Sequence, residues 1–175
     1  MGKPAKQVPV KLIAGLIYKD EGSLEKTLGI LRRRFGAIDQ RSPAMNFTYT
    51  GYYEKEFGRG LKKVFVSFTK LISAEKLAAV KNFTNKIENR LSLKNARQVN
   101  IDPGYLTLAK LVLASTKDYS HRIYLDKGIF AEITLSYRGN SFHPLEWTYR
   151  DYRTPEYIAI FNNIRNIYAQ QVKSE

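Results

Sequence analysis

The feature that most constrains the fold is a nearly continuous apolar run of strand length at residues 11–18, KLIAGLIY. A strand with one face in water alternates polar and apolar residues, whereas a strand buried on both faces has an unbroken apolar run. The run therefore predicts a central strand covered on both faces. With 175 residues the chain can bury a real core. We expect one α+β domain at residues 10–175, after a flexible basic segment at residues 1–9.

The order of the elements up to residue 101 predicts a ferredoxin-like core. Apolar residues at steps of three and four predict helices, and segments rich in Thr, Val and aromatic residues predict strands. The expected elements are a strand at 11–18, a helix from Ser23 to Phe35, strands at 45–53 and 62–69, a helix from Ser73 to Leu91 and a strand at 98–101. This βαββαβ order is that of the split βαβ motif, with an antiparallel sheet and both helices on one face.

The remaining residues predict an antiparallel β extension and a C-terminal helix. Residues 108–115 fit a strand or a helix, since their periodicity does not decide between the two. Strands are expected at residues 121–125 and 128–137. In the second, Ala131, Ile133 and Leu135 form one face, and polar residues form the other. Thr154 and Pro155 open the last helix as N-cap and first helical residue.

The charge of the chain favours an anionic partner. The formal net charge is +13, and residues 128–175 contribute nothing to it because their acidic and basic side chains are equal in number. A positive field of this size attracts phosphates on a nucleotide, on RNA or on an anionic surface. The alternative is a solvated basic surface without a dedicated partner. The chain has no cysteine and only two histidines, which excludes disulfides, thiolate metal sites and His-rich metal sites.

Known nucleotide and targeting signals are absent from the sequence. It contains neither the Walker A pattern nor G-x-G-x-x-G. Residues 84–88, TNKIE, superficially match the guanine-specificity motif of GTPases, but they fall inside a predicted helix rather than after a strand. The N-terminus has no apolar segment of signal-peptide length, and the best apolar run is too short to span a bilayer. A cytoplasmic protein without membrane contact is expected.

The segment Asp102-Pro103-Gly104-Tyr105 is the best local candidate for a site. Proline extends the residue before it and glycine permits a left-handed bend, so we expect an abrupt turn at the end of a strand. The turn would hold Asp102 rigidly, ready to bind a metal ion, a ribose hydroxyl or a basic side chain. Tyr105 would then lie beside the ligand. The alternative is a simple turn in which the Asp side chain bonds nearby amides.

Two further groups of residues could complete a site with Asp102. His121 can exchange a proton near neutral pH, and Arg122 can bind a phosphate with two hydrogen bonds. Glu132 adds a second carboxylate. Aromatic and charged side chains that could stack on a base and bind a phosphate alternate just before the last helix. They are Trp147, Tyr149, Asp151 and Arg153. A single site requires all three groups to converge.

Several segments together resemble a bacterial family whose members are uncharacterised. They are Tyr52–Glu56, Thr84–Glu88, Asn100–Leu106, Lys110–Ala114, Lys117-Asp118, His121–Leu125, Ala131-Glu132, Thr134-Leu135, Trp147–Tyr149 and Asp151–Arg153. The family is filed as a domain of unknown function, and its members are often labelled automatically as GTP-binding proteins. The resemblance extends over nearly the whole chain and implies that GTP is a candidate ligand.

Three functions remain open at this stage. The first is a protein, with or without catalytic activity, that binds a nucleotide or another phosphorylated small molecule. Asp102, His121 and Glu132 would be its candidate catalytic groups, and Mg²⁺ could accompany the nucleotide. The second is an RNA-binding module whose sheet presents aromatic side chains to bases. The third is a structural or interaction protein without catalysis. The sequence does not indicate an oligomeric state.

Overall fold

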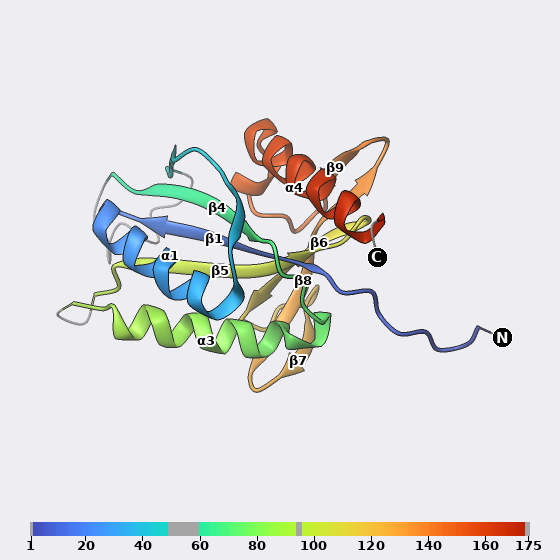
Figure 1. Cartoon of the computed structure of the whole chain (residues 1–175), viewed down its shortest axis with the longest axis horizontal. Helices are drawn as coiled ribbons and strands as arrows, with labels where there is room; N and C mark the ends of the chain where they lie inside the picture. Colours follow the sequence, from blue (N-terminus) through green and yellow to red (C-terminus); the bar gives the residue numbers. More distant parts are fainter. Residues whose placement is uncertain (1, 49–59, 94–95, 174–175) are drawn as a thin grey trace.

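The computed structural model describes residues 2–48, 60–93 and 96–173 (Figure 1). In chain order the elements are β1 (Lys11–Tyr18), α1 (Glu21–Phe35), β2 (Ile38–Arg41), β3 (Met45–Asn46), β4 (Lys62–Phe68), η1 (Ala74–Lys76), α3 (Leu77–Arg90), β5 (Val99–Leu106), β6 (Lys110–Ser115), β7 (Ile123–Asp126), β8 (Ile129–Arg138), β9 (Ser141–Pro144), η2 (Asp151–Arg153) and α4 (Pro155–Lys173). The fold is therefore of the mixed α+β class, as predicted.

Nine strands in the described part of the chain form one antiparallel sheet. Its order is β2-β4-β1-β5-β6-β8-β7, with β3 also paired to β4 and β9 also paired to β8. β1 lies between β4 and β5, and all eight of its residues are buried. The central strand predicted from the unbroken apolar run is thus confirmed. Residues 108–115, for which strand and helix were both open, contain the strand β6.

Helices cover both faces of the sheet (Figure 1). α1 and α3 pack on one face, where residues such as Leu28 and Val80 share a core cluster with Leu16 and Val66 of β1 and β4. α4 packs on the opposite face. Its buried residues, which include Phe161, belong to a second cluster with residues from β1, β4, β5, β6, β8 and β9. This two-sided cover is what the apolar pattern of β1 requires.

The starts of α1 and α3 differ from the predictions, whereas the start of α4 agrees with them. α3 begins at Leu77, after the η1 turn, and Ser73 makes no side-chain cap hydrogen bond. The carboxylate of Asp20 accepts a hydrogen bond of 3.0 Å from the backbone N–H of Ser23, so Asp20 is the N-cap in place of Ser23. Gly36 ends the helix with a φ of 96°, a conformation that favours glycine. The hydroxyl of Thr154 accepts from the Tyr157 N–H at 3.4 Å and opens α4 as predicted.

The second predicted strand differs from the structure. Of the described residues 45–48, Met45 and Asn46 form the strand β3, and Phe47 and Thr48 lie in no strand. The rest of that predicted strand lies outside the described residues. A strand at Ile38–Arg41 was not predicted; it pairs with β4 through an irregular register. Its sequence, IDQR, has no run of β-formers, so its pairing with β4 rather than local preference makes it a strand.

The Asp-Pro-Gly segment at residues 102–104 lies inside β5, and the predicted turn at a strand end is therefore wrong. The segment pairs with residues 13–15 of β1. β6 pairs only with the last three residues of β5, so residues 99–103 form an open edge. The N–H and C=O of Ile101 point to this edge, where side chains of α3 bind them. Pro103, two residues on, faces the same edge and interrupts no ladder there.

Gly104 is needed for a close approach between strands rather than for a left-handed bend. Its φ is not in the positive region. A Cβ atom at this position would lie 2.3 Å from the carbonyl oxygen of Val112 and 2.7 Å from Cδ2 of Leu113, both in β6. Real Cβ atoms essentially never approach a neighbour to less than 3.0 Å. The glycine thus lets β6 dock against β5 at the point where the two strands begin to pair.

The predicted alternation in β8 is wrong in its central part. Glu132 and Thr134 are buried, whereas Ile133 is 40% exposed. Leu111 pairs with Leu135 and the next residue of β6 pairs with Ile133, so Thr134 is an extra residue in β8. Such a bulge reverses the faces to which side chains point. Polar contacts also stabilise the buried Glu132, which lies in the site described next.

Candidate functional site

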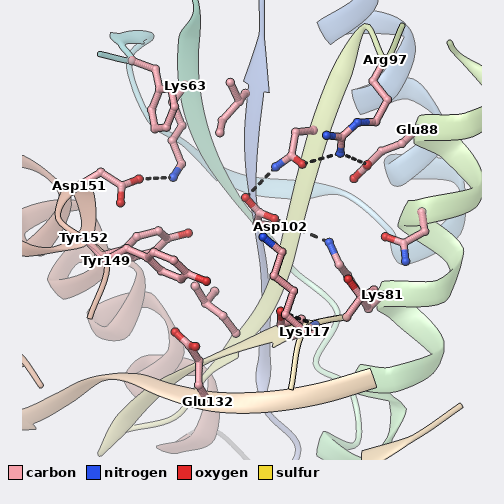
Figure 2. Close-up of a pocket in the computed structure, with 18 of the residues that line it drawn as sticks. Lys63, Lys81, Glu88, Arg97, Asp102, Lys117, Glu132, Tyr149, Asp151 and Tyr152 are labelled. Carbon is pink, nitrogen blue, oxygen red and sulfur yellow. Dashed lines mark hydrogen bonds and ion pairs between the residues drawn. The ribbon is translucent and has the colours of Figure 1, made fainter. Parts of the chain in front are cut away.

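A pocket of about 760 Å³ opens where β5 and β6 separate. β6 leaves β5 after three paired residues and continues along β8 alone. One wall comes from α3 and the open edge of β5. Another comes from the end of β6, the loop after it and Glu132 of β8, and residues 149–152 form a third. Figure 2 shows these side chains pointing into the space between the walls. The separation of two neighbouring strands therefore creates the site.

Charged side chains dominate this pocket. Among the described residues, six cationic and four anionic side chains line it: Lys63, Lys81, Arg97, Lys117, Arg122 and Arg150, with Glu88, Asp102, Glu132 and Asp151. Ion pairs join most of these groups across the walls. The excess of cations nevertheless leaves the pocket with a positive balance.

The wall of α3 and β5 is a chain of polar contacts along the open edge (Figure 2). One oxygen of Glu88 accepts from the N–H of Ile101 at 2.7 Å, and the other binds Arg97 at 2.9 Å. Arg97 also donates to Asn100 at 3.0 Å, whose amide donates to Asp102 at 2.8 Å. Burial raises the pKa of Glu88, and nearby cations and the Ile101 N–H oppose the rise. Glu88 thus takes the place of a neighbouring strand for the N–H of Ile101.

Lys81 completes this wall beside Asp102. Its ammonium group donates to the carbonyl of Ile101 at 2.9 Å and lies 3.7 Å from Oδ1 of Asp102. Lys81 is 7% exposed, whereas 30% of the Asp102 side chain is exposed. Asp102 thus reaches the pocket from a strand, next to a fixed cation.

A buried ion pair joins β4 to the η2 turn on the opposite wall (Figure 2). Lys63 Nζ lies 2.6 Å from Oδ2 of Asp151, and both side chains are at least nine-tenths buried. The same ammonium lies 4.5 Å from the centre of the Tyr152 ring. The Tyr152 hydroxyl has no hydrogen-bond partner among the described residues. Burial, and next the charge of Asp102, raise the pKa of Tyr152 well above 10.

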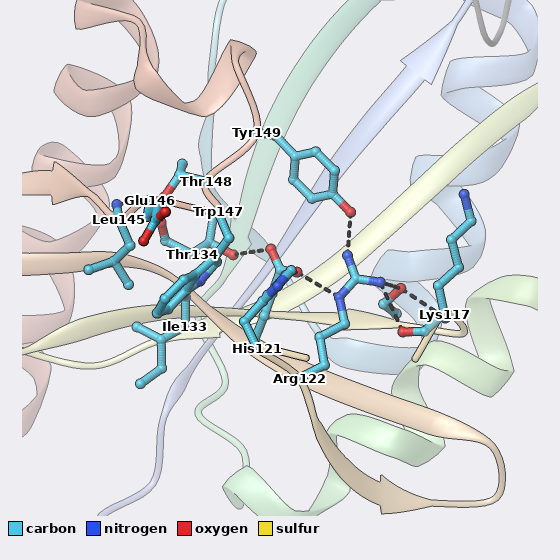
Figure 3. A network of polar contacts seen from close by, with 12 residues as sticks. Lys117, His121, Arg122, Ile133, Thr134, Leu145, Glu146, Trp147, Thr148 and Tyr149 are labelled. Carbon is cyan, nitrogen blue, oxygen red and sulfur yellow. Dashed lines mark hydrogen bonds and ion pairs between the residues drawn. The ribbon is translucent and has the colours of Figure 1, made fainter. Parts of the chain in front are cut away.

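Arg122 organises the remaining wall (Figure 3). Its Nε donates to Glu132 at 2.7 Å, and its terminal nitrogens donate to the Ser115 hydroxyl at 2.8 Å, the Lys117 carbonyl at 2.9 Å and the Tyr149 hydroxyl at 2.6 Å. A guanidinium cannot accept, so the Tyr149 oxygen accepts and keeps its own proton to donate. Burial first, and then the charge of Glu132, raise the pKa of Tyr149. Arg122 thereby connects the end of β6 and the loop after it with β8 and with Tyr149.

His121 lies behind this wall rather than in the pocket. Its ring stacks on Trp147 with 5.3 Å between centroids and 13° between planes. Its Nε2 lies 3.2 Å from the carboxylate of Glu132 (Figure 3). The indole N–H of Trp147 donates to the carbonyl of Ile133 at 2.8 Å. Neither ring lines the pocket.

Five of the nine predicted site residues meet at the pocket and four do not. Asp102, Arg122, Glu132, Tyr149 and Asp151 line it, whereas Tyr105, His121, Trp147 and Arg153 lie outside its lining. Tyr105 packs against an apolar cluster between α3 and β6. Arg153 donates to the carbonyls of Thr148 and Glu146, each at 2.7 Å, and so holds the segment before η2.

The predictions missed the residues that α3 and β4 contribute. Leu77, Lys81, Thr84 and Glu88 follow one another at steps of four, three and four, and all four are buried. A lysine and a glutamate at the spacing of a buried helical face indicate a polar site in the sequence. Burial of an unpaired charge is costly, so such residues need partners. Lys63 gives no such signal, because it follows Lys62 at the start of β4 and lysines are mostly exposed.

The described residues limit the chemistry of the pocket. Among them, no group of three or more His, Cys, Asp or Glu side chains could hold a metal ion. Both carboxylate oxygens of Glu88 are occupied, so the TNKIE segment does not present a free acceptor to a guanine base. No helix in the described part of the chain is long and apolar enough to cross a membrane.

Fold and site together define a mixed α+β domain with a charged pocket in a divided sheet. The family model that matches residues 8–168 is described as a domain of unknown function, DUF4416, and the chain belongs to this family. The match confirms the resemblance to an uncharacterised family but not the GTP-binding label. No curated protein and no solved structure matches the chain.

Proposed function

We propose that the pocket binds a phosphorylated small molecule, which is a nucleotide or a smaller phosphate. The observation that carries the proposal is a cavity of about 760 Å³ whose described lining has six cationic and four anionic side chains. Cavities of this size suit small ligands, and a few converging polar groups select among them. A cationic cavity in a chain of net charge +13 concentrates anions.

The loop after β6 and the segment before η2 are where we expect the phosphate. Lys63, Arg97 and Arg122 each form an ion pair with a carboxylate that lines the pocket. Lys117 and Arg150 line the pocket at exposed positions. The guanidinium of Arg150 makes no hydrogen bond or ion pair with the described residues, so its paired N–H donors are available for phosphate oxygens.

We further propose that the core is ferredoxin-like, and this fold favours a small ligand over RNA. The order β2-β4-β1-β5, with α1 and α3 on one face, is what a ferredoxin-like βαββαβ core would have. RNA-binding modules of this type bind bases on the face opposite their two helices. Here α4 covers that face, and Phe65 of β4 is fully buried beneath it. The RNA alternative therefore rests on net charge alone.

A thermal-shift screen tests the proposal. GTP, GMP, ribose 5-phosphate, glycerol 3-phosphate and pyrophosphate are added with and without Mg²⁺, and hits are measured by calorimetry. A ligand present at 100 times its Kd should stabilise the folded protein by about 2.7 kcal/mol. Stabilisation by GTP that is lost without Mg²⁺ would identify a nucleotide that binds as its metal complex. No stabilisation by any of these compounds would refute the proposal.

Arg150→Gln is the informative variant, and Arg138→Gln is its matched control. Both substitutions remove one exposed arginine, but Arg138 lies at the end of β8, away from the pocket. Loss of a charge-assisted phosphate contact should weaken binding about tenfold in the first variant only. Equal weakening in both would indicate general attraction by net charge. Binding of RNA that weakens steeply with salt, without small-ligand binding, would favour the RNA alternative.

A further inference from the structure

The four carboxylates in the described lining of the pocket differ in their remaining capacity to bind a ligand. Both oxygens of Glu88 and both oxygens of Glu132 accept hydrogen bonds, and their side chains are 6% and 2% exposed. Asp151 is 9% exposed and paired with Lys63. Asp102 is the exception, because 30% of its side chain is exposed. Asp102 is therefore the one accessible carboxylate among the described residues that line the pocket.

One oxygen of Asp102 has unused capacity to accept. Asn100 donates to Oδ2 at 2.8 Å. Oδ1 accepts no hydrogen bond from the described residues, and its neighbour Lys81 lies at 3.7 Å, beyond hydrogen-bond distance. Lys81 uses one of its three N–H groups on the Ile101 carbonyl. An acceptor and a cationic donor thus stand side by side at the open edge of β5.

The ammonium of Lys81 decides what this pair can bind. A ligand cation at Oδ1 would meet the charge of Lys81 and the positive balance of the pocket. A phosphate oxygen would meet the charge of Asp102 and has no proton to donate. A hydroxyl group fits, because it can donate to Asp102 and accept from Lys81 at the same time.

We propose that Asp102 and Lys81 bind a hydroxyl group of the phosphorylated ligand, which makes that ligand a sugar phosphate or the ribose phosphate of a nucleotide. This inference rests on the proposed function. It places the phosphate away from Asp102, near Lys117 and Arg150, and the hydroxyl-bearing carbon chain between the two walls. Of the three partners expected for Asp102 from sequence, it selects the hydroxyl over a metal ion or a basic side chain.

The test compares phosphates that differ in their hydroxyl groups. Calorimetry gives the Kd of glycerol 3-phosphate, ribose 5-phosphate and GMP, and of propyl phosphate, which has no hydroxyl on its carbon chain. A hydroxyl bound by two charged groups should make at least one hydroxylated probe about tenfold or more tighter than propyl phosphate. Tighter binding of GMP than of ribose 5-phosphate would assign the hydroxyl to a nucleotide, and the reverse order to a free sugar phosphate.

Asp102→Asn tests whether this pair recognises the hydroxyl group. Asp126→Asn is the control for the general effect of removing one negative charge. Asp126 is an exposed carboxylate at the end of β7, outside the pocket. In Asp102→Asn the preference for hydroxylated probes should fall to about twofold or less, while the affinity for propyl phosphate stays at or above its wild-type value. Asp126→Asn should keep the full preference.

Three results would overturn the inference. Equal binding of hydroxylated and propyl phosphates would refute it and leave the proposed function intact. A preference that persists in Asp102→Asn, with unchanged thermal stability, would move the hydroxyl to another site in the pocket. Failure of every phosphate to bind would refute the proposed function and this inference together.

Discussion

Substitution of Gly104 by alanine tests whether close contact between β5 and β6 defines the pocket. The added Cβ would lie 2.3 Å from the carbonyl oxygen of Val112, so β6 must move until the separation exceeds 3.0 Å. The oxygen belongs to backbone and cannot rotate away. Overpacking of this kind costs about 1–3 kcal/mol, and a broken ladder hydrogen bond adds about 1 kcal/mol. We expect Gly104→Ala to lower the free energy of unfolding by about 3 kcal/mol.

Urea denaturation measures this loss. With a slope of roughly 2 kcal/mol per molar urea, the midpoint should fall by about 1.5 M. Gly29→Ala is the matched control, since Gly29 lies within α1 and its added Cβ would have a side-chain atom of Arg33 as its nearest neighbour at 4.0 Å. Alanine in a helix interior should stabilise by about 1 kcal/mol. An unchanged midpoint for Gly104→Ala, or an equal loss in Gly29→Ala, would refute the reasoning.

Three further predictions concern the walls of the pocket. Lys63→Met should destabilise by about 3–5 kcal/mol in urea because Asp151 stays buried without its cation, and Lys63→Met/Asp151→Leu should recover most of that loss. The raised pKa of Glu88 means that the folded state binds this proton more tightly than the unfolded state, so stability should fall as pH rises above 4.5. Glu88→Gln should reduce this decrease of stability with pH. An unchanged decrease would contradict its attribution to Glu88. Tyr149→Phe removes a 2.6 Å partner of Arg122 and should cost about 1.5 kcal/mol; a change under about 0.5 kcal/mol would show that the bond contributes little.

The parts of the fold that the sequence predicted depend on local periodicity. The apolar run of β1 required cover on both faces, and α1 and α4 were visible in apolar steps of three and four. Gly139-Asn140 is also a turn signal in the sequence, and in the β8–β9 turn both residues have positive φ, the conformation that these residue types favour. These features were predictable because each is set by a few consecutive residues.

The parts that failed depend on pairing partners distant in sequence. Ile38–Arg41 is a strand because β4 lies beside it, and Thr134 is a bulge because β6 changes register there. Lys81 and Glu88 of α3 are buried, although the helical periodicity indicated only apolar residues and Thr84 for the buried face. Neighbouring residues in the chain do not contain this information, since it comes from contacts that form only in the folded sheet.

The candidate site divides in the same way. The sequence indicated Asp102, Arg122, Glu132, Tyr149 and Asp151 by residue type, and the structure shows that all five line one pocket. The same reasoning placed His121 and Trp147 in the site, although they stack on each other behind it. Residue type indicates what a side chain can bind, whereas the course of the backbone decides which way it points.

By itself the sequence determined a covered central strand, the positive charge and the helical faces of this protein, because these follow from the periodicity and composition of continuous segments. Only the tertiary structure decided that residues 102–104 continue β5 instead of turning. A proline and a glycine favour a turn locally, but β1 supplies the pairing, the open edge needs no N–H from Pro103, and β6 requires a glycine at its point of contact. The same open edge leaves Asp102 facing the pocket.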